Sequence, residues 1–284
     1  MSNTLGRVAL PSTLVQLAVR VIKRERSCRL AALATLVLVC ALVLTFGFGR
    51  ASAALTGESS DSGWSDAGAE TQSGAVGPAQ RPQLLLFHGG SFLYNDPYFE
   101  PLTRPRALAA GFVPHYVTYP LGDLPAAVER ARAEARRLRE KFGLDRVYAY
   151  GSSAGGTLAA LLSGDHLVNA AVAKAPVSDL TTWDWPTAKY GPEYWESLGV
   201  DLAARERLSP IRRLQLAPLL VIQGRGDHIV PPAMNETFAA AYPRVRLWLV
   251  AGGHTTERVR PFLITRAMHW LAQIASHPAA AASL

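Results

Sequence analysis

Cysteine is scarce in this sequence. Only Cys28 and Cys40 occur among 284 residues, and both lie before residue 50. Residues 81–284 therefore have no disulfide, no thiol nucleophile and no cysteine-based metal site. Such a domain folds equally well in an oxidising or a reducing compartment, so cysteine usage does not decide where the protein works.

Basic residues are not clustered in the part of the chain that is expected to fold, as they would be on a surface that binds nucleic acid. The formal net charge is +7, but residues 1–50 alone have a net charge of +6, and residues 51–80 have −4 with no lysine or arginine. The rest of the chain has a net charge of +5, with neither a clear basic cluster nor a recognition motif. A nucleic-acid-binding protein shows both features, so we expect no nucleic-acid partner.

Charge is absent from residues 30–49, which read LAALATLVLVCALVLTFGFG. This length is enough to cross a hydrocarbon core of about 30 Å at about 1.5 Å per residue. Residues 1–29 before it are basic, and the positive-inside rule then keeps the N-terminus in the cytoplasm. We expect a single-pass membrane protein whose main domain lies outside the cytoplasm.

A cleaved signal segment is the alternative for the same run. Ala51-Ser52-Ala53 matches the A-x-A pattern of signal peptidase, and secretion would follow cleavage near Ala53. The apolar run exceeds the usual length of about 7–15 residues, which favours an uncleaved anchor. The N-terminal sequence of the mature protein distinguishes the two, because cleavage produces a start at Ala54.

Four parts follow from these composition changes. Residues 1–29 are a basic cytoplasmic segment, and residues 30–49 are a transmembrane or signal segment. Residues 50–80 are rich in Gly, Ser, Ala and acidic residues, which is typical of a flexible linker. Residues 81–284 form the folded domain, with an insert at 177–216.

Short apolar runs alternate with helical patterns in the folded domain. This alternation predicts an α/β fold with a mostly parallel sheet flanked by helices. The expected strands are 84–87, 112–119, 146–150, 170–175, 219–223 and 246–250. The expected helices are 126–141, a segment around 158–162, 233–241 and 258–275. We therefore expect a sheet of about six strands.

Ser153 is the candidate nucleophile. It is the serine of Gly151-Ser152-Ser153-Ala154-Gly155, a G-x-S-x-G pattern between a predicted strand and a predicted helix. That context places the serine on a sharp turn, exposed at a helix N-terminus. A merely structural glycine-rich turn is the alternative.

Asp227 and His254 complete the candidate set. Asp227 follows the fifth strand, and His254 lies in a Gly-rich turn after the sixth. A histidine can take and return a proton near neutral pH, and an acid can orient it. The order Ser, Asp, His is that of the α/β-hydrolases. Asp227 could instead cap the following helix, and Asp179 and Asp201 are weaker rivals.

The segment His88-Gly89-Gly90-Ser91 follows the first strand. Its glycines let the backbone approach a substrate carbonyl, so the N–H of Gly89 or Gly90 would form an oxyanion hole with the N–H of Ala154. We expect His88 to be a structural hydrogen-bonding residue rather than a proton carrier.

With these motifs in place, residues 82–275 resemble the α/β-hydrolase superfamily. The HGG and GSSAGG motifs, and the segment YPLGDLPAA at 119–127, are most similar to the hormone-sensitive-lipase-like esterase branch. Ser91 stands where that branch usually has glycine, and Ser152 where it often has Asp. The linker at 50–80 also leaves no room for the first strands of the full α/β-hydrolase fold, which implies a shortened sheet. The motif around Asp227 is equally typical of the prolyl-oligopeptidase-like and dienelactone-hydrolase-like branches.

The insert at 177–216 is rich in aromatic residues. We expect it to form a lid or an acyl-pocket wall, with substrate-binding residues Trp183, Trp185, Tyr190 and Trp195. Packing of the insert onto the sheet is the alternative explanation for each of them.

The resulting functional prediction is a serine carboxylesterase that acts on a small or medium neutral ester through an acyl-enzyme, without a metal or organic cofactor. An exported serine peptidase or amidase is the alternative, and a binding protein that has lost catalysis is a weaker one. Fold alone does not choose the substrate.

Overall fold

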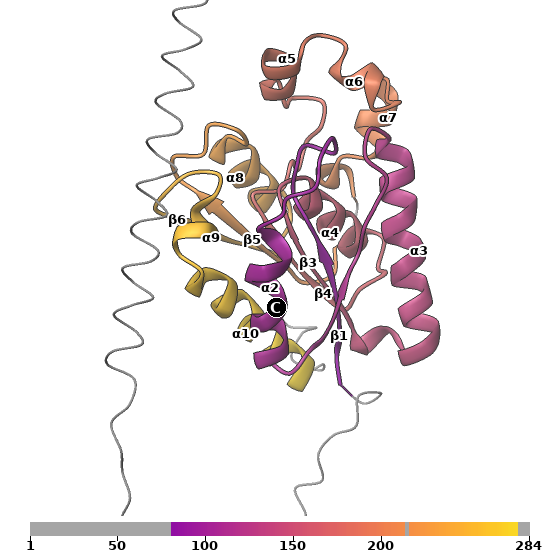
Figure 1. The fold of residues 1–284 in the computed structure, drawn as a ribbon, viewed down its shortest axis with the longest axis vertical. Helices are drawn as coiled ribbons and strands as arrows, with labels where there is room; N and C mark the ends of the chain where they lie inside the picture. The colour runs from indigo at the N-terminus through magenta and orange to yellow at the C-terminus, as the bar shows by residue number, and fades with distance from the viewer. Residues whose placement is uncertain (1–80, 214–215, 278–284) are drawn as a thin grey trace, which may run out of the picture. The chain divides into compact units, whose positions relative to one another are not determined.

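The computed structural model describes residues 81–213 and 216–277, which form one parallel sheet with helices on both faces (Figure 1). The strand order is β2-β1-β3-β4-β5-β6, and every neighbouring pair is parallel. The strands are β1 Gln83–Phe87, β2 Val113–Tyr116, β3 Val147–Ser152, β4 Ala170–Lys174, β5 Leu219–Gly224 and β6 Val245–Val250. The predicted α/β fold and its shortened sheet are confirmed.

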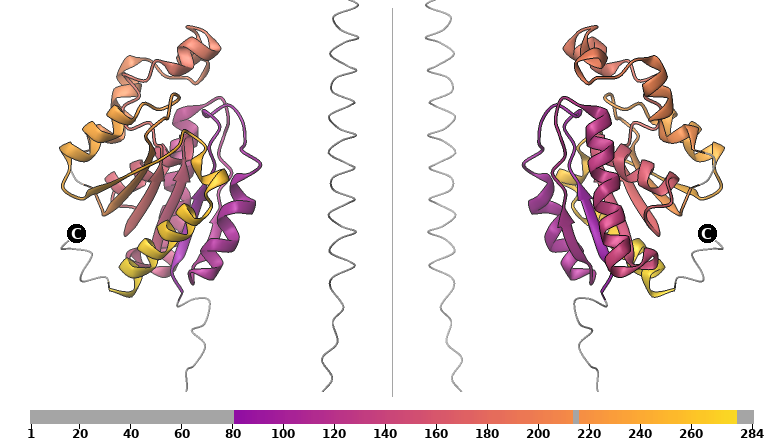
Figure 2. Two further views of the ribbon diagram at one scale, coloured as in Figure 1. Left: turned by 90° about the vertical axis from the view of Figure 1, so that its left-hand side faces the viewer. Right: turned by 90° about the vertical axis from the view of Figure 1, so that its right-hand side faces the viewer.

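Both faces of the sheet are buried, which the continuous apolar runs of the strands predict. In β1, Leu85 and Phe87 pack into one hydrophobic cluster, whereas Leu84 and Leu86 pack into the other. Side chains alternate between faces along a strand, so a strand inside the sheet contributes to both cores, whereas the edge strand β2 contributes only Tyr116, to the second. Figure 2 shows the helices on the two sides of the sheet. The first cluster includes residues of α3 Leu124–Phe142, α4 Ala154–Gly164 and α8 Pro232–Ala241, and the second includes residues of α2 Phe99–Ala109 and α10 Phe262–Ser276.

Helix α2 corrects the predicted element order, which had no helix between the first two strands. A parallel connection needs a crossover of a dozen or more residues, usually a helix. Pro101 and Pro105 obscured it, because proline inside a helix removes a backbone hydrogen bond. Pro105 nevertheless lies within α2, whose Phe99 and Ala107 are buried against the sheet. Packing here outweighs the low helix propensity of proline.

Helix α3 begins two residues earlier than predicted because Asp123 caps it. The Asp123 carboxylate accepts a hydrogen bond from the N–H of Ala126 at 2.9 Å. The predicted helix 258–275 is wrong as one element. It is split into α9 Thr256–Val259 and α10, which begins directly after Pro261. Proline favours a helix start, since it lacks the N–H that would be unpaired there.

The insert at 177–216 lies beyond the carboxyl ends of the strands (Figure 1). Its described residues form three short α-helices and one 3₁₀ turn: α5 Trp185–Tyr190, α6 Tyr194–Ser197, α7 Leu202–Arg207 and η3 Pro210–Arg212. A further 3₁₀ turn, η2 Leu144–Arg146, leads into β3.

The predicted segments 1–29, 30–49 and 50–80 lie outside the described residues, so the membrane anchor and its cleaved alternative stay predictions. Across 81–213 and 216–277, no helix has both the length and the apolar character needed to span a bilayer.

Candidate active site

Ser153 lies between β3 and α4 in a strained backbone conformation. Its φ of 55° and ψ of −119° are rare for a residue with a side chain. Such outliers persist only when the surrounding structure enforces them, and they cluster at functional sites. Its N–H donates to the carbonyl of Lys174 at 2.7 Å, which ties the turn to the end of β4.

Two glycines make this turn sterically possible. A Cβ on Gly151 would lie 2.0 Å from the carbonyl oxygen of Gly155, and a Cβ on Gly155 would lie 2.1 Å from that of Phe87. The strand, the turn and the helix are therefore in backbone contact. The G-x-S-x-G spacing follows from this crowding, because any side chain at either glycine would force the elements apart.

Three side chains from three strand ends form one hydrogen-bonded chain. His254 Nε2 lies 2.9 Å from Ser153 Oγ, and His254 Nδ1 lies 2.8 Å from Asp227 Oδ2. Asp227 follows β5 and His254 follows β6, separated from Ser153 by 74 and 101 positions. Parallel strands end at the same edge of the sheet, which is where ligands bind in such folds. The arrangement can pass a proton from the serine hydroxyl to the imidazole.

Asp227 is held on both oxygens. Its Oδ2 also accepts a hydrogen bond from Gln223 Nε2 at 3.1 Å, and its Oδ1 accepts from the N–H groups of Ile229 and Val230 at 2.9 Å each. Burial alone would raise the pKa of Asp227. The hydrogen bond and charge of His254 and the two backbone N–H groups outweigh burial and lower that pKa below its ordinary value. The carboxylate is therefore ionised and fixed toward the imidazole.

The rival acids have other partners. Asp179 accepts from the N–H and hydroxyl of Thr181, and Asp201 caps α7 by accepting from the N–H of Ala204 at 2.7 Å. The helix-capping alternative for Asp227 is wrong, because α8 begins after Pro231 without a side-chain cap. Asp227 Oδ1 instead binds the N–H groups of Ile229 and Val230 in the turn before that helix, while Oδ2 faces His254.

Gly89 and Gly90 lie opposite the serine. A Cβ on Gly89 would lie 3.3 Å from the Cβ of Ser153, so the backbone there passes directly beside the nucleophile candidate. Ala154 is the first residue of α4, and the first four N–H groups of a helix have no partner within it. The structure thus brings together the segments predicted to form the oxyanion hole. His88 beside them is stacked on Tyr119 with ring centroids 4.3 Å apart, and burial lowers its pKa.

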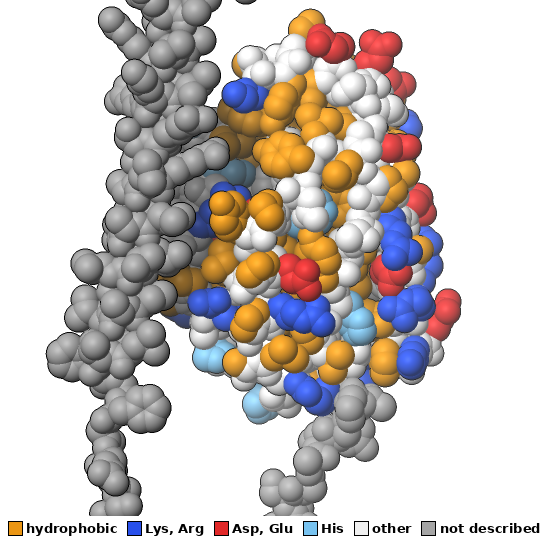
Figure 3. Space-filling model, in the orientation of Figure 1, with side chains coloured by type: hydrophobic (Ala, Val, Ile, Leu, Met, Phe, Trp, Pro, Cys, Tyr) orange, Lys and Arg blue, Asp and Glu red, His pale blue; other side chains and the backbone are white. Residues whose placement is uncertain are grey.

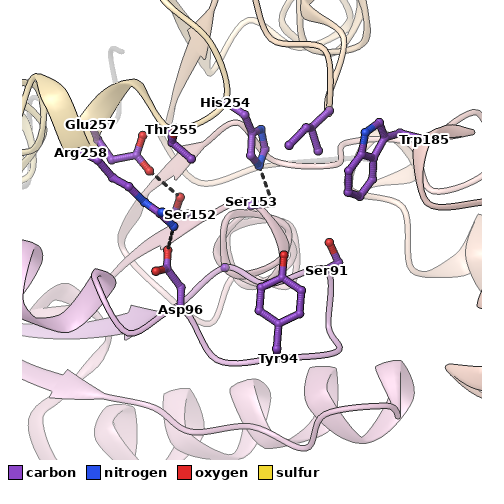
Figure 4. A pocket seen from close by; sticks show the side chains of 13 residues that line it. Ser91, Tyr94, Asp96, Ser152, Ser153, Trp185, His254, Thr255, Glu257 and Arg258 are labelled. Carbon is purple, nitrogen blue, oxygen red and sulfur yellow. Dashed lines mark hydrogen bonds and ion pairs between the residues drawn. The ribbon is translucent and has the colours of Figure 1, made fainter. Parts of the chain in front are cut away.

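A pocket of about 210 Å³ opens in front of Ser153 and His254 (Figure 4). Its wall is rich in polar groups, and its ionised side chains are paired. Asp96 forms an ion pair with Arg258 at 2.8 Å, and Glu257 forms one with Lys174 at 2.7 Å. Its remaining lining residues are Gly89, Gly90, Ser91, Tyr94, Ser152, Trp185, Ile229 and Thr255. Among the described lining residues, the Asp, Glu and Arg side chains are thus each paired with an opposite charge.

The prediction for the insert needs correction. Trp185 lines the pocket, but Trp183, Tyr190 and Trp195 do not. Trp183 and Trp195 are 2% and 8% exposed and belong to the hydrophobic core, while Tyr190 packs partly buried against it. Trp183 also donates from its indole N–H to the carbonyl of Ile229 at 2.7 Å. Aromatic density marked the insert but could not separate the pocket-facing ring from the packed ones.

We expect the two neighbouring tryptophans to respond differently to substitution. Trp183→Ala removes a buried ring and should lower the free energy of unfolding by about 3–5 kcal/mol. Trp185→Ala removes a ring that faces the pocket and should instead shift the ratio of kcat/KM between short and long acyl esters. Denaturant unfolding and ester kinetics on both variants check this. An unchanged ester preference in a folded Trp185→Ala protein contradicts the pocket-wall role.

Sequence reasoning missed five polar side chains that line the pocket: Tyr94, Asp96, Thr255, Glu257 and Arg258. Three of them lie within four positions after His254 in the sequence: Thr255, Glu257 and Arg258. Their closeness to the predicted base could have marked them as pocket residues. Asp96 carried no such signal in the sequence, because its ion-pair partner Arg258 lies 162 positions away. No cluster of three or more His, Cys, Asp or Glu that could hold a metal ion occurs in the described part of the chain.

Comparison with known proteins agrees with this geometry. The model of the prolyl oligopeptidase family matches residues 122–272, which include Ser153, Asp227 and His254. No curated protein matches the chain by sequence.

Solved structures of an esterase share the fold. Thermogutta terrifontis esterase 2 phosphonylated by sarin has 22% identity and a TM-score of 0.61, over 70% of this chain and 86% of that one. The butyrate-bound form of the same organism's Est2 esterase has 23% identity and a TM-score of 0.58, over 70% and 85%. The apo form has 23% identity and a TM-score of 0.58, over 69% and 83%. At these identities the likeness establishes the α/β-hydrolase fold.

Proposed function

Because the chain belongs to the prolyl oligopeptidase family, we propose that it is a serine hydrolase whose preferred substrates are small neutral esters. Membership in a serine hydrolase family agrees with the predicted enzyme class and superfamily. Motif resemblance favoured the lipase-like branch, whereas the matching family is the one named in the peptidase alternative. The observation that carries the ester proposal is the hydrogen-bonded chain Ser153–His254–Asp227 facing a small pocket, whose described Asp, Glu and Arg side chains are paired with opposite charges.

In the proposed mechanism, Ser153 Oγ attacks the ester carbonyl while His254 Nε2 takes the hydroxyl proton. Asp227 accepts a hydrogen bond from Nδ1–H and stabilises the imidazolium that forms. The N–H groups of Ala154 and of Gly89 or Gly90 would stabilise the oxyanion. His254 then gives its proton to the leaving alcohol. A water molecule, activated by the same imidazole, releases the acid and restores Ser153.

The size and polarity of the pocket support an ester with a short acyl chain. Its volume of about 210 Å³ is below the range of about 300–1,000 Å³ that is common for drug-sized ligands. Trp185 is the one large aromatic ring from the insert on the described pocket wall. A long acyl chain would have to leave the pocket into solvent, where its apolar surface gains nothing from binding.

The test is a substrate profile of the purified full-length chain. We expect kcat/KM to rise from p-nitrophenyl acetate to the butyrate and to gain nothing further up to the decanoate, because burial stabilises by about 0.8 kcal/mol per CH₂ only where the pocket has room. Aminoacyl and peptidyl p-nitroanilides serve as the amide series. Turnover of the anilides without any ester turnover would contradict the ester proposal and support a peptidase, the alternative that the family match favours.

A further inference from the structure

A buried ion pair lies directly behind the candidate nucleophile. Lys174 Nζ lies 2.7 Å from Glu257 Oε2, and the two side chains are only 3% and 11% exposed. Among the described residues, neither of these two atoms has a hydrogen-bond partner besides the ion-pair contact. Removing two charges from water costs more than such a pair usually returns in stability. Its presence beside the site therefore needs another explanation.

Lys174 belongs to the framework of the serine turn. It is the last residue of β4 and lies opposite Ser152 in the parallel pairing with β3. Its carbonyl accepts the N–H of Ser153 at 2.7 Å. The ammonium group thus extends from a residue whose backbone already fixes the nucleophile candidate.

Glu257 belongs to residues 251–260, the segment that contains His254 and is called the histidine segment below. It lies in α9, three residues after His254. Its second oxygen, Oε1, accepts a hydrogen bond from Ser152 Oγ at 3.2 Å, which Figure 4 shows. One carboxylate therefore joins the histidine segment to both residues that flank the serine turn: Ser152 on β3 and Lys174 on β4.

The histidine segment has a second attachment on its other side. The carbonyl of Gly252, two residues before His254, accepts the N–H of Gly226 at 2.9 Å, next to Asp227. That hydrogen bond holds the histidine segment next to Asp227, whereas the contacts of Glu257 hold the same segment next to the serine turn. Without Glu257, the described hydrogen bonds and ion pairs that remain for residues 251–260 lead to Gly226 and Asp227, to Asp96, to Leu263 of α10, or back to the segment itself. Only the 2.9 Å contact between His254 Nε2 and Ser153 Oγ then joins the segment to the serine.

We propose that Glu257, held by Lys174 and Ser152, is a positioning residue that sets His254 against Ser153. This inference rests on the proposed roles of Ser153 and His254. Reaction rates are sensitive to such placement, since a displacement of about 1 Å can cost about 10²-fold. Glu257 also lines the pocket, so substrate binding is the competing role that the test must separate.

The test compares Glu257→Gln, Lys174→Met and the double variant in the full-length chain. Each single change leaves a buried polar or charged group without its ionic partner, so we expect both to lower the thermal midpoint. The double variant removes both charges and should regain most of it. We expect Glu257→Gln and the double variant to lower kcat on p-nitrophenyl butyrate by about 10–100-fold while KM stays within about twofold.

Glu134→Gln is the matched control. Glu134 is similarly shielded, with 14% side-chain exposure, and pairs with Arg130 and Arg137 on α3. It does not line the described pocket, so its substitution should leave kcat unchanged. If Glu257→Gln does not fold, Ser152→Ala keeps the ion pair and removes only the hydroxyl link, and should lower kcat by about fivefold at constant KM.

A fluorophosphonate probe separates this inference from the proposed function. Its reaction forms a bond from Ser153 Oγ to phosphorus, expels fluoride and gives the serine proton to His254. No labelling of the wild type contradicts the serine hydrolase proposal itself. Equal labelling rates in wild type and Glu257→Gln overturn only the positioning role. The positioning role is also overturned if the double variant regains kcat together with its thermal midpoint. A Glu257→Gln effect that is confined to KM would overturn it too.

Discussion

Ser153→Ala should abolish ester hydrolysis, with a loss on the order of 10⁶ in kcat. The variant keeps His254, Asp227 and the backbone N–H groups of the turn, but no atom remains that can form the acyl-enzyme. Within the described residues, the one hydrogen bond of the Ser153 hydroxyl is with His254, and the side chain does not cap α4. The protein should therefore fold with an almost unchanged thermal midpoint.

Two measurements check this expectation: hydrolysis of p-nitrophenyl butyrate, and labelling by a fluorophosphonate followed by mass determination of the modified peptide. Ser276→Ala is the control, because Ser276 is an exposed serine at the end of α10 that bonds only to the carbonyl of Ala272 among the described residues. Ser153→Ala protein that still labels, or that retains more than a thousandth of the wild-type rate, would place the nucleophile elsewhere.

Asp227→Asn should lower kcat by about 10⁴-fold with little change in KM. The amide oxygen of asparagine can still accept the N–H groups of Ile229 and Val230, the two backbone donors that now bind Oδ1. Its NH₂ group then faces His254 Nδ1 and donates to it. Nδ1 becomes an acceptor, the ring proton moves to Nε2, and Nε2 can no longer take the proton of Ser153.

Steady-state kinetics on p-nitrophenyl butyrate measure this effect. Asp201→Asn is a control of the same chemistry, because Asp201 caps α7 and asparagine is an equally good N-cap. That variant should keep the wild-type kcat and stability. If Asp227→Asn retained kcat within tenfold of wild type, another group would have to orient the base.

Much of the architecture could be read from local patterns. Most strands contain a short apolar run, and both faces of β1 are buried as such a run predicts, whereas the edge strand β2 includes Pro114 and His115. Helix α2 could not be read this way, because Pro101 and Pro105 hide a helix whose formation depends on packing against the sheet. At Pro261 the error was the reverse, because one helix was predicted across a proline that in fact separates two, α9 and α10.

The tryptophans of the insert show a different limit. Trp183 and Trp185 are two positions apart and stack with ring centroids 6.0 Å apart, yet one is core and the other lines the pocket. Composition treats them alike. Trp183 also donates its indole N–H to the carbonyl of Ile229, more than forty residues downstream, and no local pattern predicts such a partner.

By itself, the sequence determined the sheet, the serine turn and the order of Ser153, Asp227 and His254, because these depend on local periodicity, on glycine at crowded positions and on strand ends that parallel topology brings to one edge. Only the tertiary structure decided the pocket wall and the links among Ser152, Lys174 and Glu257. These contacts join residues up to 162 positions apart, and no local pattern records which distant side chain will neutralise a buried charge.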